Sequence, residues 1–114
     1  MGRAKPVDRI DLLQGTLDLL VLRLLKSGDL NGWDIMQRIR VVSGEVISVT
    51  AGALYPALHR LEHRGLVTAT WGASDSNRRA RFYRLTAAGR KALDAERKTW
   101  ARFAGAVESL LREA

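Results

Sequence analysis

The sequence predicts a mainly α fold of the α+β kind, in which three helices precede a two-stranded β-hairpin and one long helix closes the chain. Up to about residue 63, apolar residues recur at intervals of three and four. Between residues 66 and 85 they alternate around a polar loop, and from residue 86 the helical spacing returns. At 114 residues the chain has the size of one domain with a modest core.

The first predicted helix runs from Asp11 to Lys26. Its apolar residues surround almost the whole helical wheel, whereas a surface helix carries a single apolar stripe. Because the run contains Asp18 and Arg23 and is shorter than the roughly 20 residues that a membrane span needs, it belongs inside protein. So small a domain covers only one side of this helix, and we expect a second subunit on the other side. The residues expected at that interface are Leu13, Leu17 and Leu20.

The second predicted helix is short and amphipathic. Asn31 is its N-cap, apolar residues follow at helical spacing, and Gly44 ends it. The next segment, from Val46 to Val49, is rich in β-branched residues, and we expect a brief strand there. Thr50 then offers a capping hydroxyl to the third helix, which Gly65 terminates. The apolar stripe of the third helix consists of Leu54, Leu58 and Leu61.

Two β-rich runs follow, residues 66–71 and 80–85, separated by a loop rich in Gly, Ser, Asp and Asn. This pattern predicts a hairpin. Thr86 then caps a long last helix that is apolar on one side and charged on the other. The apolar spacing resembles a short coiled-coil seam, which we expect to meet a partner. The seam consists of Leu93, Trp100, Phe103, Val107, Leu110 and Leu111.

Three helices followed by a two-stranded wing form the winged helix-turn-helix arrangement, in which the third helix enters the major groove of DNA. We therefore expect three parts in the chain. Residues 1–10 form a flexible basic arm, residues 11–85 the winged helix-turn-helix, and residues 86–114 a dimerisation helix packed into the same compact unit.

The charge of the chain indicates a polyanionic partner. Lys and Arg number 19 against 12 Asp and Glu, which gives a net charge of +7. Most are Arg, whose planar guanidinium matches phosphates and base edges, so double-stranded DNA is favoured over a membrane surface. The absence of Cys excludes disulfides, thiolate catalysis and Cys-bound zinc, and it fits a reducing cytoplasm. We expect no secretory signal and no cofactor.

The third helix presents a face for reading DNA, opposite its apolar stripe. Tyr55 and His59 lie four residues apart and point the same way, and small residues at the helix start allow close approach. The alternative is that Tyr55 is a half-buried packing residue. The residues expected to contact DNA from this helix are Thr50, Ala51, Gly52, Tyr55, His59 and Arg60.

The wing carries a dense cluster of guanidinium groups. The segment from Arg78 to Arg84 contains four Arg and no acidic residue, and such a hairpin tip can hold phosphates or enter a minor groove. A solvated strand face is the alternative. The residues expected to contact DNA from the wing are Asn77, Arg78, Arg79 and Arg81.

Two other functions fit parts of the sequence. The run from His59 to His63 matches the H-x-x-E-H pattern of zinc peptidases, but it lacks a third ligand and the core stripe already requires Leu61. A dimeric protein-interaction module that uses its basic face for an acidic partner is the second alternative. We expect a binding protein, not an enzyme.

Trp100 faces the apolar seam of the last helix. Near a dimer axis, two copies of this side chain would form a slot for a small aromatic or hydrophobic effector. Ordinary interface packing is the alternative, since a Trp at helical spacing usually belongs to a core.

Several motifs stand at specific spacings along the chain. They are Leu24-Leu25, Gly32-Trp33-Asp34-Ile35, Gly52-Ala53-Leu54-Tyr55-Pro56-Ala57-Leu58-His59-Arg60-Leu61-Glu62, Gly65-Leu66-Val67, and Arg81-Phe82-Tyr83-Arg84-Leu85-Thr86-Ala87-Ala88-Gly89. In combination they resemble the PadR family of bacterial regulators, from about Leu12 to the end of the chain.

The resemblance implies a winged-helix dimer whose last helix crosses to the partner's first helix, and which represses a promoter by binding an inverted repeat. Because one helix follows the wing, it implies the shorter subfamily. By position, Tyr55 matches the tyrosine of the family's recognition helix, and Trp100 matches the tryptophan of drug-binding relatives. Arg78, Arg79 and Arg81 match the family's basic wing.

The chain departs from the family pattern at two places. Many members have a glycine before the wing arginines, where this chain has Ser74-Asp75-Ser76-Asn77. One turn after Trp100, where drug-binding relatives can have an acid, this chain has Ala104. The second departure argues against a cationic drug as the effector.

Overall fold

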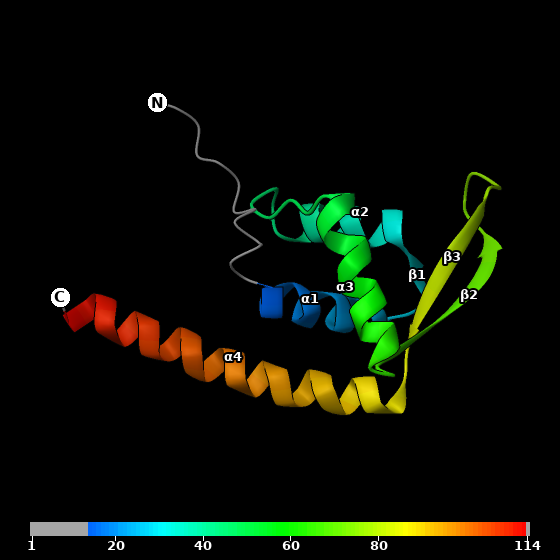
Figure 1. Ribbon diagram of the computed structural model, residues 1–114. Coiled ribbons are helices and arrows are strands. Elements are labelled where there is room, and N and C mark those ends of the chain that lie inside the picture. Colours follow the sequence, from blue (N-terminus) through cyan, green and yellow to red (C-terminus); the bar gives the residue numbers. More distant parts are fainter. Residues whose placement is uncertain (1–13, 114) are drawn as a thin grey trace.

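The computed structural model describes residues 14–113 and confirms the predicted fold class of helices followed by a wing. Figure 1 shows a compact group of short helices, a hairpin that projects from it, and a long last helix that extends past it. The predicted basic arm lies outside the described residues, as does Leu13. The elements are α1 (Gln14–Lys26), β1 (Leu30–Asn31), α2 (Gly32–Val42), α3 (Ala51–His63), β2 (Val67–Ala73), β3 (Arg79–Leu85) and α4 (Ala87–Glu113).

The core lies where α1, α2 and α3 meet the base of the sheet and the first turns of α4. The predicted stripe of α3 is fully buried there, which explains the spacing of its three leucines. The largest side chains with almost no exposed surface are Val21, Leu22, Ile35, Leu54, Leu58, Leu61, Val67 and Leu93. None of the helices in residues 14–113 is both long enough and apolar enough to cross a bilayer.

The sheet has three antiparallel strands in the order β1-β3-β2, one more than the predicted hairpin. The extra strand pairs Leu30 with Tyr83 and Asn31 with Phe82. Asn31 also caps α2, because its side-chain Oδ1 accepts a hydrogen bond from the backbone N–H of Asp34 at 2.8 Å.

The prediction of a strand from Val46 to Val49 is wrong, since this segment is irregular. It leads out of a tight turn between α2 and α3, in which Gly44 and Glu45 have φ angles of 65° and 69°. The backbone N–H of Ile47 donates to the hydroxyl of Ser43 at 3.0 Å and has no strand partner.

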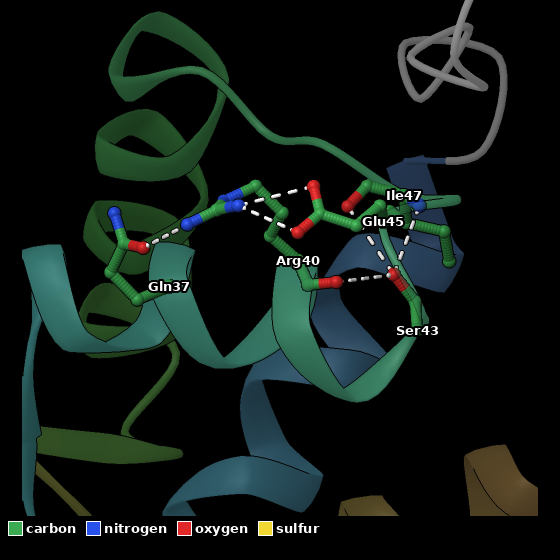
Figure 2. Close-up of polar contacts among 5 residues, drawn as sticks. All are labelled: Gln37, Arg40, Ser43, Glu45 and Ile47. Carbon is green, nitrogen blue, oxygen red and sulfur yellow. Dashed lines mark hydrogen bonds and ion pairs between the residues drawn. The ribbon is translucent and has the colours of Figure 1, made fainter.

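Figure 2 shows how this turn is held. The guanidinium of Arg40 binds both carboxylate oxygens of Glu45, at 3.1 and 2.9 Å, and also the side-chain oxygen of Gln37 at 2.6 Å. A non-glycine residue in the left-handed region is costly unless its surroundings fix it, and this ion pair does so for Glu45.

The wing joins α4 through a short, close-packed connection. The backbone N–H of Thr86 donates to the carbonyl of Leu66 at 3.1 Å, and its hydroxyl donates to the carbonyl of Gly65 at 2.8 Å. The same hydroxyl accepts from the N–H of Gly89 at 3.0 Å, which confirms Thr86 as the cap of α4. Gly89 lies directly against the backbone of Leu66, and a Cβ there would overlap the Leu66 carbonyl oxygen.

Candidate nucleic-acid interface

The exposed face of α3 is held in place by its capping residue and its buried face. The hydroxyl of Thr50 accepts a hydrogen bond from the backbone N–H of Ala53 at 3.2 Å, so this residue acts as the N-cap. Ala51, Gly52 and His59 are exposed on the helix that follows. Small and polar side chains are therefore exposed on the side of α3 that lies opposite its buried leucines.

Tyr55 is partly a packing residue and partly a surface residue. Its side chain is 45% exposed, and its hydroxyl lies against Gly32 at the start of α2. A side chain at position 32 would collide with the Tyr55 ring, so the glycine of the Gly32-Trp33-Asp34-Ile35 motif makes room for it. Tyr55 is therefore positioned on α2 while its outer side faces solvent.

Arg60 lies at a different place from the other predicted DNA-contacting residues. Its guanidinium forms an ion pair with Asp18 of α1 at 3.0 Å, and its side chain is 38% exposed. This contact ties the recognition helix to α1 inside the domain. A reading role was predicted from charge and position on the helix, which do not reveal an acid 42 residues away.

The tip of the wing, where this chain has Ser74-Asp75-Ser76-Asn77, is a tight turn. The N–H of Asn77 donates to the carbonyl of Ser74 at 2.8 Å, and the N–H of Ser74 donates to the carbonyl of Arg78 at 2.8 Å. Asn77 has a φ angle of 63°, in the left-handed region that Asn tolerates better than most residues. Asn77 thus takes a backbone conformation that glycine adopts most readily.

The wing arginines have different surroundings. The guanidinium of Arg79 lies over the ring of Trp71, 4.6 Å from its centroid. Arg81 forms an ion pair with Glu62 of α3 at 3.0 Å. The exposed guanidinium of Arg78 has no hydrogen-bond or ion-pair partner anywhere in residues 14–113. Arg78 is therefore the wing arginine best placed to meet an external anion.

A cleft of about 730 Å³, which we call the wing cleft, separates the wing from the start of α2 and from Tyr55. Both faces predicted to contact DNA border it. Its lining consists of Asn31, Gly32, Trp33, Asp34, Tyr55, Trp71, Ser74, Asp75, Ser76, Arg78, Arg79, Ala80, Arg81 and Tyr83.

The H-x-x-E-H pattern has a structural explanation. Leu61 lies in the core and Glu62 is engaged by Arg81, while His59 and His63 are exposed. Within residues 14–113 there is no cluster of three His, Cys, Asp or Glu side chains suited to a metal ion.

The residues predicted at a subunit interface fall into two groups. Leu17 and Leu93 are 3% and 1% exposed and belong to the core cluster of their own chain, in which α1 packs on α4 as well as on α3 and the sheet. They belong to the core and leave no surface for a partner. Leu20 is half-buried beside α2. The other predicted interface residues form an exposed apolar stripe on the second half of α4, namely Trp100, Phe103, Val107, Leu110 and Leu111.

A second cavity of about 480 Å³ lies between the start of α1 and the middle of α4. It is lined by Trp100, for which a slot between two subunits was predicted, and by Glu96, which lies one turn before the tryptophan. The sequence prediction considered an acid only at the position one turn after Trp100, which is Ala104, and therefore did not identify Glu96. A search four residues in both directions along the helix would have found it.

Two carboxyl groups near this cavity have raised pKa values. Burial raises the pKa of Asp18 above its ordinary value of 3.8, and the attraction of Arg60 offsets only part of that effect. Burial also raises the pKa of Glu96 above 4.5, with a further contribution from the negative charge of Asp18. Both groups therefore hold protons more tightly in the folded protein than in the unfolded chain.

This predicts a pH dependence of stability. A raised carboxyl pKa gives stability that is fully present below the ordinary pKa and is lost as the pH rises through the folded value. We expect the free energy of unfolding of the wild type, minus that of Glu96→Gln, to decrease as the pH rises above the ordinary Glu pKa of 4.5. Urea titrations at each pH measure this difference. The control is Glu113→Gln at the end of α4, and an increasing Glu96 difference curve contradicts the assignment.

Comparisons with known proteins agree with this architecture. The family model of the PadR-like transcriptional regulators matches residues 21–95. A protein of Lysinibacillus sphaericus is 30% identical over 93 residues, which are 82% of this chain and 85% of that protein. Transcriptional regulator Rv3488 of Mycobacterium tuberculosis is 45% identical over 65 residues, which are 57% of this chain and 53% of the regulator.

Solved structures show the same fold. A transcriptional regulator from Clostridium thermocellum superposes with a TM-score of 0.79 and 28% identity, over 87% of this chain and 96% of the other. A PadR family transcriptional regulator from Eggerthella lenta superposes with a TM-score of 0.72 and 29% identity, over 90% and 87%. The match of sequence motifs, family model and fold leads to one conclusion: the chain belongs to the PadR-like family of transcriptional regulators.

Proposed function

We propose that this regulator binds double-stranded DNA in a sequence-specific manner, with α3 in the major groove and the wing on the adjacent backbone. The observation that carries the proposal is the wing cleft, which brings the exposed face of α3 and the wing arginines to one side of the molecule. In this arrangement Tyr55 and His59 meet base edges, and Arg78 meets phosphate.

Acidic partners divide the arginines into structural and available groups. Three arginines form ion pairs within the domain: Arg60 with Asp18 at 3.0 Å, Arg81 with Glu62 at 3.0 Å, and Arg84 with Asp29 at 2.8 Å. Arg78 and Arg79 have no acidic partner in the described part of the chain, although Arg79 stacks on Trp71. We therefore assign the main phosphate contacts of the wing to Arg78 and Arg79.

We further propose that the protein acts as a homodimer and represses transcription from an inverted repeat. The second half of α4 carries the exposed apolar stripe described above, with Trp100 and Phe103 in ring contact at a centroid distance of 6.0 Å. A second copy covers this stripe at least cost, because identical stripes complement each other about a twofold axis. The two α3 helices then lie on successive major grooves.

Release by a small aromatic or hydrophobic effector is the last part of the proposal. The 480 Å³ cavity beside Trp100 adjoins both α1 and the stripe of α4. An effector that wedges these helices apart changes the spacing of the two recognition helices, and therefore the fit to an inverted repeat. The carboxylate of Glu96 favours an effector that carries a hydrogen-bond donor.

Two substitutions distinguish phosphate contacts from base contacts. Arg78→Ala is expected to weaken specific and non-specific DNA binding by a similar factor and to lower the salt slope by about one per subunit. Tyr55→Ala is expected to weaken binding to the selected operator by about 1–3 kcal/mol and to affect random DNA much less. Fluorescence anisotropy over a series of salt concentrations measures both quantities.

Arg112→Ala is the matched control, because it removes an exposed guanidinium from the far end of α4. The operator is first obtained by selection from a pool of random duplexes. An acidic-protein partner in place of DNA predicts no selected sequence and no difference between these variants. Such a result overturns the proposed function.

A further inference from the structure

The wing cleft carries more aromatic surface than contact with a phosphate backbone requires. Four of its lining residues are aromatic, and three of those side chains are largely exposed: Trp33 at 63%, Tyr55 at 45% and Trp71 at 59%. Exposed aromatic rings gathered around one concave site mark a place where a flat apolar surface is bound. Of these aromatic residues, only Tyr55 was predicted from the sequence to contact DNA.

The rings on two sides of the cleft are fixed by their surroundings. Tyr55 lies over Gly32, at a position where no other residue type leaves room for it. On the wing, Trp71 lies under the guanidinium of Arg79, and buried Tyr83 lies 5.9 Å from the guanidinium of Arg81. Planar guanidinium groups stacked on rings extend the flat surface and add positive charge to it.

The charge of the lining indicates what the flat ligand carries. Among residues 14–113, Arg78 and Arg79 have no acidic partner, and both line the cleft. Their positive charge favours an anionic group at the wing side. Asp34 and Asp75 also line the cleft and supply acceptors for amino or hydroxyl groups. A planar ring with polar donors and an attached anion satisfies all three features.

We propose that the wing cleft is a binding site for a small aromatic anion of the mononucleotide type, with its ring on Trp71 and Arg79 and its phosphate at Arg78. The site is separate from the cavity beside Trp100, since the two share no lining residue. One consequence rests on the proposed function: because DNA uses the same arginines, the ligand and DNA exclude each other at this cleft.

The first test omits DNA. Adenosine monophosphate is titrated into the full-length protein, and binding is followed by calorimetry and by tryptophan fluorescence. We expect saturable binding, and at least about tenfold weaker binding of adenosine and of inorganic phosphate, because each lacks one half of the recognition. Trp71→Ala and Arg79→Ala are expected to lower affinity by about tenfold or more, and Trp71→Phe to retain most of it.

Two matched variants serve as controls. Trp100→Ala removes a tryptophan from the other cavity, and Arg84→Ala removes an arginine from β3 that is paired with Asp29 outside the cleft. Both are expected to bind adenosine monophosphate like the wild type. Binding that is lost in Trp100→Ala but kept in Trp71→Ala overturns the proposal, as does absence of binding at about 1 mM ligand. Circular dichroism confirms that each variant is folded.

The second test separates this site from the proposed DNA contact. Adenosine monophosphate at saturation is expected to weaken operator binding by the wild type, while Arg84→Ala shows the same weakening. One outcome is that the nucleotide binds with the predicted dependence on Trp71, while the affinity for the operator does not change. This result supports the ligand site and contradicts the DNA contact assigned to the cleft. If DNA binds and the nucleotide does not, the ligand site alone fails.

Discussion

Gly89→Ala is expected to destabilise the protein by about 3 kcal/mol, at the upper end of the usual cost of overpacking. The added Cβ overlaps the carbonyl oxygen of Leu66 and approaches Cδ1 of Leu85. The Leu85 side chain can rotate away. The contact with Leu66 is made by its backbone carbonyl at the start of the wing, which cannot move without the strand that follows it. Urea unfolding followed by circular dichroism measures the change in the free energy of unfolding.

Gly105→Ala is the matched control for this prediction. Gly105 lies in the same helix, on the side opposite the apolar stripe, and an added Cβ would have no heavy atom of the described residues within 4 Å apart from its own helical turns. Replacement of an interior helical glycine by alanine is expected to stabilise the protein by about 0.5–1 kcal/mol. Changes of equal sign and size at the two positions would contradict the close contact at Gly89.

The combined substitution Phe103→Asp and Leu110→Asp is expected to convert the proposed dimer into a folded monomer. Both side chains are largely exposed in the single chain, so the core does not depend on them. Loss of the second subunit removes the second half-site, and affinity for the inverted repeat is expected to fall at least about 100-fold. Sedimentation velocity measures the mass, and anisotropy measures the affinity.

The control places two carboxylates elsewhere on the same helix. Ala101→Asp and Ser109→Asp are exposed positions away from the apolar stripe, and the pair is expected to remain dimeric. Binding to an isolated half-site is expected to be similar in both double variants. A monomeric wild type, or a dimer that survives Phe103→Asp and Leu110→Asp, contradicts the assignment of the stripe.

The local features of the fold could be predicted because they depend on neighbouring residues. Asn31, Thr50 and Thr86 cap the helices that the sequence assigned to them, and Gly65 ends α3 with a φ angle of 75°. Helix caps and apolar stripes depend on residues within a few positions, so one sequence is sufficient to find them.

The features that were missed depend on contacts between distant parts of the chain. Strand β1 has two residues and exists because β3, about 50 positions later, lies beside it. A helical wheel shows that α1 needs cover on two sides, but not that Leu17 is buried in the core of its own chain instead of against a partner. Charge likewise grouped Arg60 and Arg81 with Arg78, although distant acids engage the first two.

The joint at Thr86 gives the molecule the mechanics of a lever. Only this residue separates β3 from α4, and Gly89 holds the first turn of the helix against the start of β2. A helix of 27 residues is about 40 Å long at a rise of about 1.5 Å per residue. The shorter arm, a hairpin of two seven-residue strands, reaches about 23 Å at about 3.3 Å per residue.

A displacement at the free end of α4 is therefore transmitted to the tip of the wing with a smaller amplitude. A shift of about 3.5 Å at the free end of α4 tilts the helix by about 5°, and the same tilt moves the wing tip by about 2 Å. Figure 1 shows the two arms diverging from the joint. A tilt of this size would reposition Arg78 at the wing tip by about 2 Å, and the core side chains that α4 and the sheet contribute, such as Leu93 and Val67, would shift with it.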